Sequence, residues 1–218
     1  MVFTQALGLR RGLTSVIGSG GKSTLLETLA SELRAEHRVI LCTTTHMFPA
    51  SGMETVGEPD ERRILELLCS DHAVCVGEPA QDGRLHSPQL PMSRLMELAD
   101  FVLVEADGSK RLPLKAHAGH EPVIPAESSL TVCVVGLSGL GRPVREAVHR
   151  PELFPGGADG DVTVERLAEA LNAEALGDIY FLNQCDVAGE GRAGRLARLL
   201  DKPCVAGSLQ KGVVQCLF

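Results

Sequence analysis

The stretch that most constrains the fold of this chain is VIGSGGKSTLLETLASEL, residues 16–33. Apolar residues lead into a run of glycines, and a segment of helical character follows that begins with Lys-Ser-Thr. Glycines let a backbone approach a dense phosphate charge, because they lack a Cβ and tolerate positive φ. The first turn of a helix adds free amide donors and a favourable dipole. The order of strand, glycine turn and helix therefore predicts a phosphate-binding loop.

Each residue type in this loop has an expected role. The glycine backbone would surround the phosphate oxygens, Lys22 would neutralise the β- and γ-phosphates, and Ser23 would bind Mg²⁺. The common pattern GxxxxGK[ST] needs a glycine at position 16, where this chain has Val16, so the loop is shortened or its first glycine is displaced to Gly18. The predicted nucleotide-binding residues of the loop are Gly18, Ser19, Gly20, Gly21, Lys22, Ser23 and Thr24.

Elsewhere, apolar runs of strand length alternate with segments of helical period. This pattern predicts a three-layer, P-loop NTPase-like α/β fold, in which helices flank a mostly parallel sheet. We expect one nucleotide-binding domain over residues 1–218, with a small hairpin insertion near 77–90, around Asp82-Gly83, and an irregular functional loop at 107–129. The expected strands are 14–17, 38–42, 73–76, 101–104, 130–135, 179–182 and 204–206.

Composition narrows the possible partners. The formal net charge is −7 and no basic run exceeds two residues, which argues against binding to nucleic acid. The N-terminal stretch lacks the pattern of a signal peptide, and no apolar run approaches the roughly 18 residues that span a bilayer, so no membrane association is expected. Seven cysteines without a CxxC pair are typical of buried thiols in a reduced compartment. We therefore expect a cytoplasmic protein.

A second motif addresses the nucleobase. The segment YFLNQCD ends an expected strand with Asn183 and Asp186 at the N-x-x-D spacing that resembles the guanine-specificity element of GTPases, with Gln184 where lysine is more usual. The Asp186 carboxylate would accept hydrogen bonds from the two guanine N–H groups, which adenine cannot supply. The later segment CVAGS stands where GTPases commonly place a backbone contact to the base. GTP is therefore favoured as the ligand, with ATP as the open alternative.

Acidic residues follow the expected strand at 101–104. Carboxylates at this place in phosphate-loop folds commonly orient Mg²⁺, directly or through its water, and Gly108 could meet a γ-phosphate. The spacing Glu105-x-x-Gly108 also resembles the acidic element of GTPases that mature metal enzymes. The predicted metal residues are Ser23, Glu105 and Asp107.

Hydroxyl groups follow the expected strand at 38–42. The threonines at 43–45 could contact metal or phosphate, and His46 beside them is a candidate ligand or acid. Nucleotide hydrolysis depends on placement and charge and needs no nucleophilic side chain. Lys22 would stabilise phosphate charge, and a loop carboxylate or threonine would position water. The predicted catalytic residues are Lys22, Asp107 and Thr45.

The loop at 107–129 carries further polar side chains. Lys110, Arg111 and Lys115 could contact an anionic substrate. His117, His120 and Glu121 are close enough in sequence to bind a metal, although we expect His117 to be solvated. The later segment GLGRPVREAVHRPE offers arginines for the same role. The predicted contacts to a substrate or other ligand are His46, Lys115, His120, Glu121 and Arg150.

These stretches together resemble the YqeC-like family. The segments GSGGKST, TTTH, LVEADGSKRLPLKAHAGHEPVIP, VVGLSGLGRPV, VHRPE and LNQCD occur in that order, from about residue 14 to 187, and the EADG-to-VIP block is the most specific. A proline usually stands in the family where this chain has His117, which weakens the case for His117 as a shared ligand. His120 and Glu121 remain in place.

The family is described as accessory proteins of selenium-dependent molybdenum hydroxylases. The resemblance implies a phosphate-loop, nucleotide-binding accessory factor that helps to make or load a molybdenum or selenium centre, with an apo molybdenum hydroxylase or a cofactor-maturation protein as partner. The motifs themselves predict Mg²⁺ with GTP or ATP. Two other functions remain open. One is a kinase or nucleotidyl transferase acting on a small cofactor precursor, and the other is a nucleotide-switched binding module with little turnover.

Overall fold

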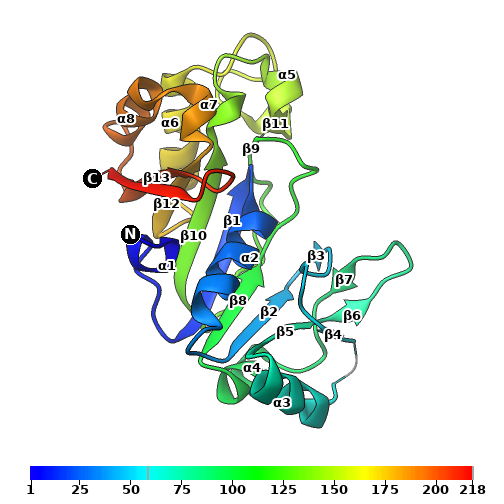
Figure 1. Ribbon diagram of the computed structural model, residues 1–218. Helices are drawn as coiled ribbons and strands as arrows, with labels where there is room; N and C mark the ends of the chain where they lie inside the picture. The colour runs from blue at the N-terminus through cyan, green and yellow to red at the C-terminus, as the bar shows by residue number, and fades with distance from the viewer. Residues whose placement is uncertain (58, 218) are drawn as a thin grey trace.

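The computed structural model describes residues 1–57 and 59–217, and its centre is a nine-stranded sheet (Figure 1). The strand order is β14-β13-β12-β10-β1-β8-β2-β5-β4, and every neighbouring pair is parallel except β13 with β14. The strands are β1 (Gly12–Ser19), β2 (Val39–Thr43), β4 (Thr55–Val56), β5 (Ala73–Val76), β8 (Phe101–Glu105), β10 (Ser128–Gly136), β12 (Ile179–Asn183), β13 (Cys204–Ser208) and β14 (Val213–Leu217).

Helices cover both faces of the sheet. On one face, α1 and α2 bury their apolar side chains against the sheet, and α2 crosses in front of the strands in Figure 1. On the other face, α6 and α8 pack on one half of the sheet and α3 with α4 on the other half. The helices are α1 (Phe3–Ala6), α2 (Lys22–Leu33), α3 (Glu61–Ser70), α4 (Met92–Leu98), α5 (Val144–Ala147), α6 (Val164–Glu174), α7 (Cys185–Ala188) and α8 (Glu190–Ala197), with 3₁₀ turns η1 (Leu137–Gly139) and η2 (Pro151–Leu153).

The period of two along each strand separates these layers. In β12, Phe181 packs with the α1 and α2 side, whereas Tyr180 and Leu182 pack with α6 and α8. Strands buried on both faces read as continuous apolar runs, which is why their positions are visible in the sequence. All seven expected strands are present, and the predicted three-layer α/β fold with a mostly parallel sheet is confirmed.

Short strands form two small sheets at the carboxyl ends of the central strands. β9 (Leu114–Lys115) pairs with β11 (Val148–His149), and β3 (His46–Met47) joins a hairpin made of β6 (Glu78–Pro79) and β7 (Leu85–His86). Asp82 and Gly83 lie in the turn of this hairpin. The two small sheets extend the molecule on either side of the phosphate loop, as Figure 1 shows.

The structure also bears on the expectations about cysteine burial and membrane association. Cys42, Cys75, Cys133, Cys185 and Cys204 are buried and Cys69 is exposed, while the side chain of Cys216 lies outside the described part of the chain. Within residues 1–57 and 59–217, no helix has both the length and the apolar character needed to cross a membrane.

Candidate functional site

The glycine loop joins β1 to α2 in a backbone conformation that requires glycine. Gly18, Gly20 and Gly21 have φ values of 86°, 88° and 132°, in a region that other residues rarely adopt. A Cβ on Gly20 would lie 2.7 Å from the carbonyl oxygen of Pro113, and one on Gly21 would overlap the side-chain amide of Asn183. The loop is therefore tightly enclosed on its outer side, and its inner side is open to a cavity.

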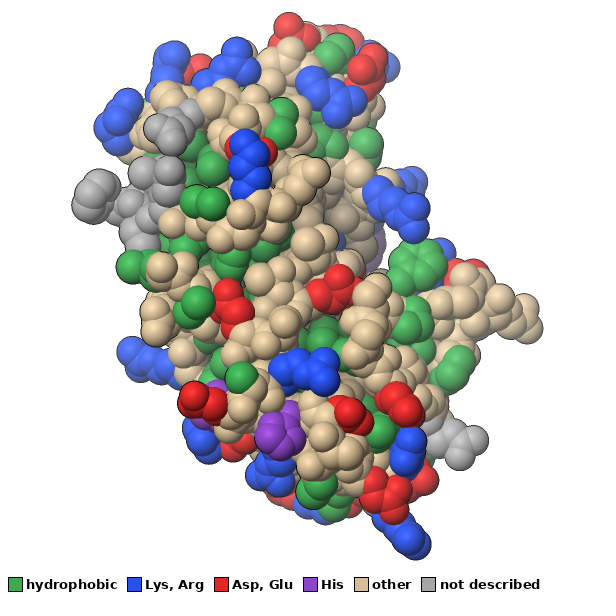
Figure 2. Space-filling model, in the orientation of Figure 1, with side chains coloured by type: hydrophobic (Ala, Val, Ile, Leu, Met, Phe, Trp, Pro, Cys, Tyr) green, Lys and Arg blue, Asp and Glu red, His purple; other side chains and the backbone are tan. Residues whose placement is uncertain are grey.

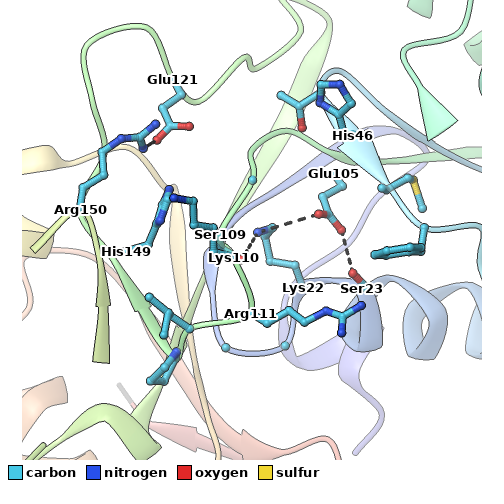
Figure 3. Close-up of a pocket in the computed structure, with 18 of the residues that line it drawn as sticks. Lys22, Ser23, His46, Glu105, Ser109, Lys110, Arg111, Glu121, His149 and Arg150 are labelled. Atoms are coloured by element: carbon cyan, nitrogen blue, oxygen red, sulfur yellow. Dashed lines mark hydrogen bonds and ion pairs between the residues drawn. The ribbon is translucent and has the colours of Figure 1, made fainter. Parts of the chain in front are cut away.

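Lys22 and Ser23 lie where the loop becomes a helix. Lys22 is 3% exposed, and its Nζ donates to the carbonyl oxygen of Gly18 at 2.8 Å and to the hydroxyl of Ser109 at 3.1 Å. The Ser23 hydroxyl donates to Oε2 of Glu105 at 3.0 Å (Figure 3). These contacts place an ammonium, a hydroxyl and a carboxylate together at the mouth of the loop.

The Ser23 and Glu105 pair fits Mg²⁺. Magnesium takes hard oxygen ligands and usually uses one or two protein ligands beside phosphate oxygens and waters. Burial raises the pKa of Glu105, against the opposing effect of Lys22 and of the Ser23 hydrogen bond, so a divalent cation there would favour the ionised carboxylate. Across the described residues, no group of three or more His, Cys, Asp and Glu side chains is arranged to hold a metal, so a magnesium site here would depend on the phosphates.

Asp107 lies beneath the loop and does not line the cavity. Its carboxylate is fully buried, accepts from the Gly18 amide at 2.9 Å, and forms ion pairs with Lys22 at 2.9 Å and Lys115 at 3.2 Å. Burial alone would raise the pKa of Asp107, but the hydrogen bond from His117 and the two ammonium groups lower it to about 2. This position gives direct Mg²⁺ binding and catalysis by Asp107 no support; its contacts assign it to positioning the loop.

His117 is not solvated, so that prediction is wrong. Its side chain is 4% exposed and bridges two carboxylates, with Nε2 2.8 Å from Asp107 and Nδ1 2.7 Å from Glu174 at the end of α6. Burial alone would lower the pKa of His117, but the hydrogen bonds to the two carboxylates outweigh it and the pKa is raised. His117 therefore connects the phosphate loop to a helix on the far layer.

Lys115 is buried as well, although the sequence suggests a ligand contact. Its side chain has no exposed surface and pairs with Asp107 and, at 2.9 Å, with Glu121. Glu121 in turn contacts Arg150 (Figure 3). Burial lowers the pKa of Lys115, and the neighbouring Asp107 carboxylate opposes that shift. Lys115 thus lies behind the cavity wall. Of this series of ion-paired residues, Glu121 and Arg150 line the cavity.

The cavity lies at the carboxyl ends of the parallel strands, where open α/β sheets bind their ligands, and has a volume of about 1860 Å³. It is much larger than the roughly 300–1,000 Å³ of common small-molecule sites. In Figure 2 a hollow at the right-hand edge has basic, histidine and apolar side chains beside it. The predicted residues that line the cavity are Gly20, Gly21, Lys22, Ser23, Thr24, Thr45, His46, Glu105, His120, Glu121 and Arg150; Gly18, Ser19, Asp107, Lys115, Asn183 and Asp186 do not.

The threonines after β2 support the same region. Thr43 is buried and donates from its hydroxyl to the carbonyl oxygen of Glu105 at 2.8 Å, and it accepts from the Thr45 amide at 3.0 Å. Thr45 and His46 thereby reach the cavity from the strand next to β8. The His46 ring also lies against His86, with centroids 4.3 Å apart.

Asn183 and Asp186 lie behind the loop. The Asn183 amide donates to the carbonyl oxygen of Gly20 at 2.8 Å and accepts from the amide of Leu209 at 3.1 Å, so it ties the loop to the end of β13. Asp186 lies 3.4 Å from the ammonium of Lys211, and a hydrogen bond from Ser208 lowers its pKa. A base bound by Asp186 would therefore have to replace these partners.

The sequence pattern does not single out Glu174, Ser109 or Phe48 as parts of the site. Glu174 ends an amphipathic helix, 57 positions from His117, so no local signal connects the two. Ser109 directly follows the EADG segment, and this position could have indicated that its hydroxyl belongs to the site. Phe48 is 51% exposed in the cavity wall, and such exposure is visible only in the structure.

The mostly parallel sheet between two layers of helices, with a glycine loop joining β1 to α2, forms a P-loop NTPase-like three-layer fold. The family model described as YqeC protein matches residues 14–152, and the chain belongs to the YqeC family. It is 38% identical over 154 residues to the "Uncharacterized protein YqeC" of Escherichia coli (strain K12). That match covers 66% of this chain and 60% of the relative, so the chain spans about 60% of that relative's length.

Replacement of Gly20 by alanine tests the packing of the loop. The added Cβ meets backbone atoms of Gly136 and Pro113, and we expect the free energy of unfolding to fall by roughly 3 kcal/mol in chemical denaturation. Gly157→Ala is the matched control, because Gly157 has φ 75° and open space around its Cβ. It should cost roughly 1 kcal/mol through backbone strain alone, and equal losses in the two variants would contradict the close packing.

His117→Gln tests the buried charge bridge. Because the pKa of His117 is raised on folding, its contribution is complete below the unfolded pKa of about 6.5 and is lost as the pH rises through the folded pKa. We expect the variant to lower the free energy of unfolding by roughly 2 kcal/mol at about pH 6 and by clearly less at about pH 9. The control is His120→Gln in the same loop, where His120 is exposed. A loss in His117→Gln that does not change with pH would contradict the charged bridge.

Proposed function

We propose that this protein is a Mg²⁺-dependent nucleoside triphosphatase, with GTP favoured over ATP, that serves as an accessory factor in the maturation of a selenium-dependent molybdenum hydroxylase. The observation that carries the nucleotide part is the glycine loop, whose positive-φ backbone is open only to glycine, with Lys22 held at its base and Ser23 beside Glu105. The contacts of these residues match what a chain of phosphates with one magnesium ion requires.

The loop can bind phosphates with little rearrangement. The amides of the loop and of the first turn of α2 are donors without helical partners, and the helix dipole adds a partial positive charge. The Lys22 ammonium is held close by the Gly18 carbonyl and Ser109, and Asp107 keeps it in place. A pre-organised cation loses little freedom on binding, so these groups favour a tightly held β-phosphate.

Hydrolysis would rest on placement and charge. Mg²⁺, when bound, supplies charge neutralisation on the phosphates. Ser23 and Glu105 would hold it, Lys22 would stabilise charge on the phosphates, and the hydroxyl of Thr45 would orient a water from the neighbouring strand end. His46 lies next to Thr45 at the cavity wall and could exchange a proton with that water.

Guanine preference rests on the N-x-x-D spacing of Asn183 and Asp186, which supplies a carboxylate for the base. An ionised carboxylate can accept from both guanine N–H groups, whereas adenine offers no matching donors and would leave the charge unpaired. Binding would replace the hydrogen bond from Ser208 and would require the Lys211 ammonium, 3.4 Å away, to move aside. The lysine is 63% exposed and does so at little cost. Asn183 already holds the loop next to Asp186 and would fix their relative position.

The role in maturation rests on the family resemblance. We propose an apo molybdenum hydroxylase or a cofactor-maturation protein as the partner, with nucleotide hydrolysis driving transfer or release. The family membership supports this context but names no reaction, and the relative from Escherichia coli is described only as uncharacterized.

A second candidate function is transfer of a phosphoryl or nucleotidyl group to a small acceptor. The specific observation in its favour is the size of the cavity, which extends from the phosphate loop to β11 and to the β6–β7 hairpin. A simple hydrolase needs only water beside the γ-phosphate and has no use for the additional space.

Lys22→Ala tests nucleotide binding. We expect it to weaken binding of GDP with Mg²⁺ at least about 100-fold in calorimetric titration, because the charge-assisted contacts to the phosphates are lost. Arg62→Ala is the control, since Arg62 is 90% exposed on α3 and outside the cavity. If the wild-type protein binds neither GDP nor ADP, the proposed function fails.

Asp186→Asn tests the choice of base, and Glu105→Gln tests the metal. Asp186→Asn should weaken GDP binding at least tenfold and leave ADP binding within about twofold. An equal effect on both nucleotides would refute the guanine assignment.

Glu105→Gln should still bind nucleotide in the absence of metal. It should lose most of the increase in affinity and in turnover that Mg²⁺ gives the wild-type protein. Unchanged magnesium dependence would remove Glu105 from the site.

A further inference from the structure

The cavity beside the phosphate loop is more basic than the chain as a whole. Its lining contains six Lys and Arg side chains and four Glu side chains, whereas the entire chain has 21 Lys and Arg against 28 Asp and Glu. Three of the four glutamates already have partners, because Glu78 accepts from Gln89, Glu105 accepts from Ser23, and Glu121 pairs with Lys115 and Arg150. Lys22, Arg84, Arg142 and Arg150 have carboxylate partners as well. Among the described residues, Lys110 and Arg111 are the cavity cations without an ion-pair partner, so their charge is available to a ligand.

Three of these cations lie on left-handed backbone. In the described part of the chain, six residues other than glycine have positive φ, and four of them line the cavity. Left-handed backbone is unfavourable for residues with a Cβ and is concentrated at functional sites. The four residues are Lys110, Arg111, Arg150 and Gln184.

Lys110, His149 and Arg150 form one wall, which we call the basic wall. Figure 3 shows them on the side of the cavity away from Ser23, whereas Arg111 extends beneath Ser23. Among the described residues Lys110 has no ion-pair partner. Burial lowers the pKa of His149, and the nearby Lys115 and Lys110 lower it further, as expected where positive charges face one another. An anion at the basic wall would relieve this repulsion.

An apolar surface completes the same cavity. The ring of Phe48 is half exposed and lies under the guanidinium groups of Arg111, at 5.3 Å, and Arg84, at 5.9 Å. An aromatic ring next to two cations can contact the organic part of a ligand while the arginines meet its charges. The cavity thus offers one apolar contact and a basic wall beyond the space needed for a nucleotide's phosphates.

We propose that the basic wall binds a second substrate, a small organic phosphate, which lies in the cavity together with the nucleotide. The inference rests on the proposed function, because it takes the glycine loop to be occupied by the nucleotide. Lys110 and Arg150 hold the phosphate group of this second ligand, and its organic part contacts Phe48. This ligand would lie close to the terminal phosphate of the nucleotide. It would fill the part of the cavity that hydrolysis alone does not require.

Phenyl phosphate is a suitable probe, with phenol as the uncharged control ligand. It is titrated calorimetrically into protein saturated with GDP and Mg²⁺, so that the glycine loop is filled. We expect wild-type protein to bind phenyl phosphate and not phenol at equal concentration. Lys110→Asn should weaken the binding at least about fivefold and Lys110→Arg should retain it, because asparagine tolerates left-handed backbone and arginine keeps the charge. Arg145→Gln is the control, since Arg145 is exposed and pairs with Asp159 outside the cavity.

The affinity for GDP separates this inference from the proposed function. Lys110→Asn should leave GDP binding within about twofold of wild type. If GDP binds but phenyl phosphate does not, or if Lys110→Asn weakens both to the same extent, the second site is refuted and the nucleotide site stands. If wild-type protein does not bind GDP, the proposed function fails. Phenyl phosphate is then titrated into the Lys22→Ala variant without nucleotide, with and without Lys110→Asn. Binding that depends on Lys110 supports the basic wall as a site, and the absence of such binding overturns it.

Discussion

A single buried carboxylate, Asp107, connects the phosphate loop to the rest of the molecule. It accepts the amide hydrogen of Gly18 and pairs with Lys22, Lys115 and His117. Burying one charge among several is costly unless all are paired, and removal of the carboxylate would leave buried cations without compensation. The loop is therefore held in its shape before any ligand arrives, and so is the ammonium that would meet the phosphates.

The network of ion pairs around Asp107 has two branches. Through His117 and Glu174 it reaches α6 on the far layer of the sheet, and through Lys115 and Glu121 it reaches Arg150 at the cavity. The β9 and β11 pair carries the second branch, because it sets the strand that contains Lys115 beside the strand that ends next to Arg150. One network thus supports both the phosphate loop and the basic wall, which gives the two proposed ligands a shared and rigid frame.

The sequence predicts the central strands, the glycine loop and the Ser23 and Glu105 pair, because these depend on local periodicity and on residues next to strand ends. It misplaces His117 and Lys115, since a buried ion pair between distant residues has no local signal and both residue types are normally solvated. The two-residue strands at β9 and β11 escape detection for a related reason, since they are too short to show a period. The sequence motif predicts that Asn183 contacts the base, whereas in the structure its side chain donates to the backbone of the loop.

The most direct test of the central claim is a crystal structure of the protein with Mg²⁺ and a GTP analogue that resists hydrolysis. We expect the β-phosphate within the loop of residues 18–22 and the Lys22 ammonium in contact with phosphate oxygens. Mg²⁺ should lie between Ser23 and Glu105, whose direct hydrogen bond should be lost. Asp107 should keep its contact with the Gly18 amide. A nucleotide bound elsewhere, or a loop that stays empty at saturating ligand with Ser23 still bonded to Glu105, would contradict it.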